Sequence, residues 1–86
     1  MKKSFAFAYR RTTNDRNGNS RHWVNIYQVK RNVPVLIAHN VKCGCLGKKA
    51  TVLSMIVRLG LLPADKAQYG SKWVEENTNI TELEAI

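Results

Sequence analysis

Three segments in the first half of the chain have the patterns of β-strands, and short links join them. Residues 4–12 and 22–31 alternate between the two faces of a strand, as half-buried strands do, whereas residues 34–41 form a nearly continuous apolar run, which is also typical of a strand. The Asn17-Gly18 pair between the first two segments is a strong hairpin signal. Because parallel neighbours need a crossover of about a dozen residues or more, these links predict a three-stranded antiparallel meander.

The alternation also assigns side chains to the two faces of the sheet. Phe5, Phe7 and Tyr9 fall on one face of the first strand, and Trp23 and Tyr27 fall together on one face of the second. If these five aromatic side chains share a face, they form either the core or a surface on which unpaired bases stack. A domain this small must bury its large aromatic residues, which favours the core, with Tyr9 as the expected exception.

A break that contains two glycines separates the predicted strands from a predicted helix over residues 48–60. Leu53, Ile56 and Val57 recur there at three- and four-residue spacing, and further apolar residues widen the apolar arc. A helix this apolar must be largely buried, and Gly60 suits its C-terminal cap.

The pattern weakens beyond this helix. Pro63 and Gly70 favour a short second helix over residues 63–69, and a short strand is predicted near residues 72–76. Residues 75–86 are acidic, and a strand, a helical turn opened at Thr81 or a frayed tail over residues 77–86 all fit them. The expected architecture is therefore a single small α+β domain over residues 1–86, in which one main helix packs on the meander.

Positive charge is concentrated in the first two thirds of the chain. The 14 Lys and Arg residues against six Asp and Glu give a net charge of +8 and a pI near 9.9. Residues 1–58 hold twelve of the basic residues and one acid, whereas residues 59–86 hold two basic residues and five acids. This distribution is typical of a protein that binds a polyanion, although a solvated basic surface that only aids solubility fits it too.

The predicted meander brings the basic residues to one end of the domain. The Asn17-Gly18 hairpin, the end of the third strand and the start of the main helix all meet there, and the first turn of a helix attracts anions. We expect the basic side chains at this end to contact phosphates and the aromatic ones to lie near bases. The candidate binding residues are Tyr9, Arg10, Arg11, Arg16, Arg21, Trp23, Lys42, Lys48 and Lys49.

Two cysteines and a nearby histidine raise the question of a metal site. His39, Cys43 and Cys45 carry zinc-type donor atoms, and His22 is a conceivable fourth ligand. The Cys-x-Cys spacing is not that of structural zinc sites, and a disulfide across so short a span is strained. We therefore expect two reduced thiols, no metal and no cofactor.

The sequence offers little support for catalysis. The glycine break before Lys48 lacks the spacing of a phosphate-binding loop, and a pair of His39 with Cys43 or Cys45 would lack an obvious orienting group. The leading hypothesis is a small non-enzymatic protein that binds DNA or RNA. The alternative is a small adaptor or inhibitor, such as a phage accessory or anti-defence protein. It would dock on an acidic or nucleic-acid-binding host complex.

The expected location is the cytoplasm, as a monomer or homodimer without membrane contact. No apolar run reaches the ~18 residues of a membrane span, and residues 4–9 are too short for the core of a signal peptide.

Overall fold

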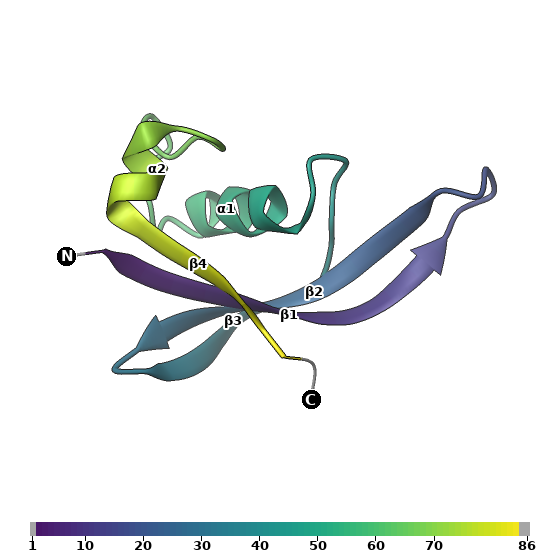
Figure 1. Cartoon of the computed structure of the whole chain (residues 1–86), viewed down its shortest axis with the longest axis horizontal. Coiled ribbons are helices and arrows are strands. Elements are labelled where there is room, and N and C mark those ends of the chain that lie inside the picture. Colours follow the sequence, from purple (N-terminus) through teal and green to yellow (C-terminus); the bar gives the residue numbers. More distant parts are fainter. Residues whose placement is uncertain (1, 85–86) are drawn as a thin grey trace.

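A four-stranded sheet with two helices on one side makes up the computed structural model, which describes residues 2–84 (Figure 1). The strand order is β3-β2-β1-β4. In chain order the elements are β1 (Lys3–Asn14), β2 (Ser20–Lys30), β3 (Val33–Lys42), α1 (Lys48–Arg58), α2 (Lys72–Asn77) and β4 (Thr78–Leu83).

The predicted α+β class, antiparallel meander and main helix are confirmed. β1 pairs with β2 and β2 with β3 in antiparallel fashion, with Phe7 opposite Ile26 near the middle of the sheet. Gly60 follows α1 with a φ of 78°, and the N–H of Leu61 donates to the carbonyl of Ile56. Glycine at this left-handed position ends the helix as predicted.

The short second helix and the last strand lie later in the chain than predicted. Residues 63–69 form turns, and Ala67 is the one buried side chain among them. A short helix is stabilised mainly by packing of an apolar face, and one buried residue does not provide such a face. Residues 72–76, predicted as a strand, lie in α2, whose start is capped by the Ser71 hydroxyl accepting from the N–H of Val74 over 3.2 Å. The hydroxyl cap satisfies a free helix donor and favours a helix at this point.

The acidic C-terminal segment is a strand along most of its length. Thr78–Leu83 pairs in parallel with β1, with Ile80 opposite Phe5. Of the three possibilities for residues 75–86, the strand is therefore the observed one from residue 78 to residue 83, whereas residues 75–77 lie at the end of α2. Ala85 and Ile86 lie outside the described residues.

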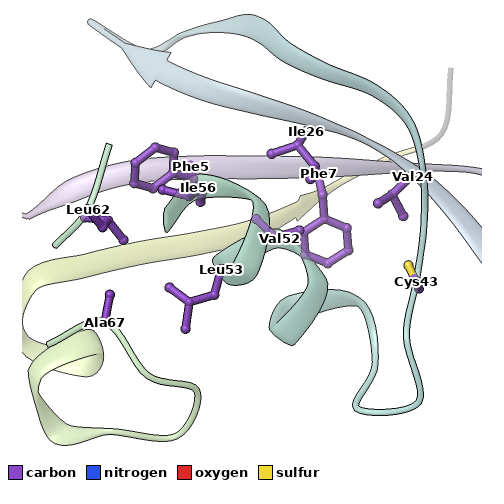
Figure 2. Close-up of a cluster of buried hydrophobic side chains, with 10 residues drawn as sticks. All are labelled: Phe5, Phe7, Val24, Ile26, Cys43, Val52, Leu53, Ile56, Leu62 and Ala67. Carbon is purple, nitrogen blue, oxygen red and sulfur yellow. The ribbon is translucent and has the colours of Figure 1, made fainter. Parts of the chain in front are cut away.

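The core lies between α1 and one face of the sheet (Figure 2). Phe5, Phe7 and Ile26 project from the strands toward Val52 and Ile56 of the helix, and all five side chains are buried. Removing one of these phenylalanine rings costs about 3–5 kcal/mol in a typical core. Phe5 and Phe7 are thus core residues, as favoured from the sequence.

Both helices lie on the same side of the sheet (Figure 1). Within residues 2–84 the other side, called the open face below, has no helix over it. None of the helices in this part of the chain is both long and apolar enough to cross a membrane.

Candidate nucleic-acid interface

A β-bulge in β1 places two consecutive arginines on the open face. Tyr9 pairs with Val24 and Arg11 pairs with Trp23, so Arg10 is an extra residue on its strand. Residues that oppose each other across a ladder project to the same face. Val24 is buried under α1, so Tyr9 lies on the helix side, whereas Trp23 and its partner Arg11 lie on the open face.

Arg10 belongs to the open face by the ordinary alternation of the strand. Asn25 is two residues from Trp23 on β2 and therefore shares the open face with it. Ala8 is paired with Asn25 and lies on that face too, and Arg10, two residues after Ala8, follows it there. The bulge then turns Arg11 to the same side, because a β-bulge sets two residues of one strand opposite one residue of the other. The sequence signal for this bulge is the doubled arginine, which interrupts the alternation but does not by itself distinguish a bulge from the end of a strand.

Arg11 is held against the ring of Trp23. Its guanidinium carbon lies 4.7 Å from the centre of the ring, and the indole N–H of Trp23 donates to the hydroxyl of Thr13 over 2.9 Å. A cation over an aromatic face is attracted to the ring electrons. Trp23 therefore positions the charged group of Arg11.

Two further basic residues lie beside this pair. Arg21 is paired with Thr13, and Lys42 at the end of β3 is paired with Trp23. By the same pairing rule both occupy the open face. We call the set the basic face, and it consists of Arg10, Arg11, Arg21, Trp23 and Lys42.

His39 also reaches the basic face, which the sequence did not indicate. Its Nδ1 lies 3.5 Å from a guanidinium nitrogen of Arg10, at the outer limit of a hydrogen bond. The pairing of β3 with β2 is irregular next to His39. Asn40 takes a φ of 58° there, and the backbone N–H of Asn40 donates to the side-chain oxygen of Asn25 over 2.9 Å. Asparagine tolerates this left-handed conformation better than most residues.

Tyr9 and Lys48 lie on the helix side of the sheet, away from the basic face. The Lys48 ammonium lies 5.0 Å from the centre of the Tyr9 ring and 3.9 Å from a carboxylate oxygen of Glu82. The Tyr9 hydroxyl hydrogen-bonds Thr12, whose hydroxyl lies 3.1 Å from Nδ1 of His22. Tyr9 is half-buried in this cluster and is not the exposed exception that the sequence suggested.

The start of α1 carries lysines and no acid, as its sequence implies. Gly47 precedes the helix and provides no side-chain cap, and the first turn contains no acidic residue. Lysines are unfavourable at this positive end of the helix dipole. Glu82 supplies the missing negative charge from the end of β4 by pairing with Lys48.

The remaining candidates are dispersed. Arg16 lies at the tip of the β1–β2 hairpin, and Lys49 lines a shallow groove with Leu53 and Tyr69. The nine predicted residues thus form one group of five on the open face and four residues elsewhere. The phenylalanines and Tyr9 also lie on the opposite face from Trp23 and Tyr27, so the five aromatic side chains do not share one face.

The hairpin tip is fixed by Asp15. One of its carboxylate oxygens accepts the N–H groups of Asn17 and Asn19, each over 2.9 Å, and Gly18 takes a φ of 80°. The hydrogen bond from Asn19 is the main reason that the pKa of Asp15 is lowered. The carboxylate of Asp15, on which the charge of Arg21 also acts, therefore holds the turn.

The two cysteines have different surroundings. Cys43 is buried, Cys45 is exposed, and both are free thiols. Burial raises the pKa of the Cys43 thiol, which keeps it protonated at neutral pH. Among residues 2–84 no three His, Cys, Asp or Glu side chains lie close enough to hold a metal ion.

The strands contain almost no negative charge. Glu82 is the single acidic residue in β1 to β4, and it is paired with Phe7 on the helix side of the sheet. The open-face positions of the strands therefore carry basic, polar and apolar side chains but no acid.

Comparison with known families, with curated proteins and with solved structures finds no match to this chain. Its function must be inferred from its geometry and charge.

Proposed function

We propose that this chain is a small, non-enzymatic nucleic-acid-binding protein that contacts phosphates through the basic face. The observation that carries this proposal is the β1 bulge, which sets Arg10 and Arg11 side by side on the helix-free side of the sheet. Arg21 and Lys42 lie on the same side, next to Trp23. Four cations without an acid among them attract a phosphate backbone and release its counterions.

The shape of the basic face supports the same function. On the basic face, Trp23 lies between its pairing partners Arg11 and Lys42. A sheet surface with an aromatic ring among its cations accepts an extended polyanion more readily than it accepts a small anion, because small anions favour pockets. The fork of donors on each arginine matches the oxygens of a phosphate group. His39 contacts Arg10, and His22 contacts the Thr12 hydroxyl, which is also hydrogen-bonded to Tyr9.

Replacing three cations of the basic face tests this proposal. We expect the triple variant Arg10→Ala, Arg11→Ala and Arg21→Ala to bind labelled nucleic acid at least about ten-fold more weakly in fluorescence anisotropy. The slope of log K against log salt concentration should also fall by up to about 0.9 for each phosphate that the variant no longer neutralises.

A second triple variant provides a control with the same change in net charge. Lys30, Lys66 and Lys72 are exposed and lie outside the basic face. Their replacement by alanine should change affinity and salt slope much less than the first variant does. Equal losses in the two variants, with circular dichroism showing both folded, would contradict the site. An absence of binding by the unmodified protein to DNA and RNA would contradict the function.

A protein-binding adaptor or inhibitor is the second candidate function. The observation that favours it is a group of exposed apolar side chains at the start of the edge strand β3, where Val33 is 57% exposed and Leu36 is 51% exposed. Exposed apolar residues that cluster often mark contact surfaces between proteins. A partner retained in equal stoichiometry after nuclease treatment, and lost on Val33→Ser with Leu36→Ser, is the expected result for this candidate. Retention by that variant would count against it.

A further inference from the structure

The β1–β2 hairpin continues beyond the rest of the sheet as a two-stranded arm. Toward the hairpin turn, the pairing of β2 with β3 stops at Trp23, and the pairing of β1 with β4 stops at Ala8. Residues 12–22, which we call the arm, include three further pairs from Thr12–His22 to Asn14–Ser20 and the turn that joins them. Figure 1 shows the arm projecting past the start of α1.

Nothing in the composition of the arm serves the core. Residues 12–22 contain no apolar side chain, and apart from Gly18 every one of them has hydrogen-bonding groups. A bare two-stranded hairpin is only marginally stable in water. A projecting strand pair that buries no apolar side chain is therefore more consistent with binding than with packing.

Hydrogen bonds between neighbouring side chains stiffen the arm. On the helix side, the Ser20 hydroxyl donates to the side-chain oxygen of Asn14 over 3.0 Å, and Thr12 contacts His22. At the tip, Asp15 accepts two backbone N–H groups. The arm carries Arg21 on the open face and Arg16 at the tip, and Arg11 lies beside its base on the open face.

We infer that the arm enters the major groove of B-form duplex DNA, an inference that rests on the proposed nucleic-acid function. Two paired strands are about 4.8 Å apart, and the major groove of B-DNA, roughly 12 Å wide, admits such a ribbon. The three pairs beyond Arg11 extend about 10 Å at ~3.4 Å per residue, close to the ~8.5 Å depth of that groove. The major groove of duplex RNA is too narrow and deep for side chains to enter.

The side chains of the arm also suit the edges of bases. Arginine forms paired hydrogen bonds with guanine in the major groove, and asparagine does so with adenine. Arg16 lies at the tip between Asp15 and Asn17 and is exposed. With the arm in the groove, Arg11 and Arg21 at its base lie near the phosphates, and Arg16 lies deepest.

The test compares three labelled ligands of one sequence at one salt concentration, using the full chain. They are a DNA duplex of ~20 base pairs, the corresponding RNA duplex and the single DNA strand. We expect the DNA duplex to bind about ten-fold or more tightly than either alternative. Methyl green, which occupies the major groove, should displace the protein, whereas netropsin, which occupies the minor groove, should not.

A tip variant connects this result to the arm. Arg16→Ala should weaken binding to the DNA duplex by about three-fold or more, and Lys66→Ala, which removes one exposed charge elsewhere, should not. Displacement by netropsin alone, a preference for RNA duplex or single strand, or equal binding by the two variants would overturn the arm's role while leaving nucleic-acid binding intact. Failure to bind all three ligands would instead overturn the proposed function itself.

Discussion

At the scale of single residues, the contact between Arg11 and Trp23 decides how the basic face presents its charge. An arginine on a strand surface normally samples many rotamers, and fixing it on binding costs about 0.5–1.5 kcal/mol. Here the guanidinium already lies 4.7 Å from the ring centre, and Thr13 holds the indole in turn. Part of the conformational restriction of Arg11 is therefore present before a ligand binds.

Trp23 should accordingly contribute to affinity through Arg11. A cation–π contact at an exposed site is worth about 0.5–1 kcal/mol, so Trp23→Leu is expected to weaken nucleic-acid binding about two- to five-fold. Trp23→Phe keeps an aromatic face and should weaken binding less. Anisotropy titrations of both variants measure the difference, and a leucine variant that binds as tightly as the unmodified protein would contradict the role of the ring.

Most of the basic face can be predicted from residue types, but not the division of residues between faces. Arg10, Arg11, Arg21, Trp23 and Lys42 are all among the predicted residues because charge and strand position identify them. The bulge at Arg10 depends on how β1 pairs with β2, and simple alternation does not contain that information. Lys48 is charged and follows the glycine break, but only the pairing of β4 with β1 places Glu82 beside it.

At the scale of elements, the hairpin turn is the part most sensitive to acid. Its two backbone N–H donors lower the pKa of Asp15, so the folded value lies below the unfolded one. Stabilisation of the turn is then fully present above about pH 3.9, the unfolded value, and is lost as the pH falls through the lowered pKa.

This linkage predicts different behaviour for two substitutions of Asp15. Asp15→Ala removes the acceptor, and amide exchange at Asn17 and Asn19 should accelerate at neutral pH. Asp15→Asn keeps an acceptor oxygen without a titrating group, so its turn should be less perturbed and independent of pH. Hydrogen exchange followed by NMR distinguishes them, and unchanged exchange in the alanine variant would show that the carboxylate does not hold the turn.

The contact between the end of β4 and the start of α1 links the acidic and basic parts of the chain. Replacing Glu82 by glutamine removes the partner of Lys48 and raises the net charge by one. We expect nucleic-acid binding to tighten about two-fold at low salt, with stability changed by less than about 1 kcal/mol because the pair is partly exposed. An unchanged affinity would show that β4 only packs against β1.

The elements themselves are predictable where the periodicity is long. Three strands and α1 each extend over ten or more residues, and their patterns predict them nearly to their observed bounds. α2 and β4 are six residues each, too short for a pattern to separate helix from strand. The Ser71 cap favours a helix for α2, and pairing with β1 makes β4 a strand. That pairing joins segments far apart in the sequence, so a local pattern does not predict it.

At the scale of the whole molecule, the fold separates packing from charge. The helix side of the sheet holds the core, and the opposite side holds a concentration of cations with no acid in the strands. We propose that one face of this small sheet serves stability and that the other binds a polyanion. The central claim is therefore that nucleic acid binds on the open face at the bulge.

The fluorescence of the two tryptophans tests that claim most directly, because they lie in different parts of the molecule. Trp23 is in the basic face, whereas Trp73 in α2 packs against the core and lines a small cavity with Lys3 and Leu62. In the variant Trp73→Phe, emission from Trp23 should change as nucleic acid is added, with the same midpoint as the anisotropy. In the variant Trp23→Phe, emission from Trp73 should stay constant. A response from Trp73 while Trp23 remains silent would contradict the account.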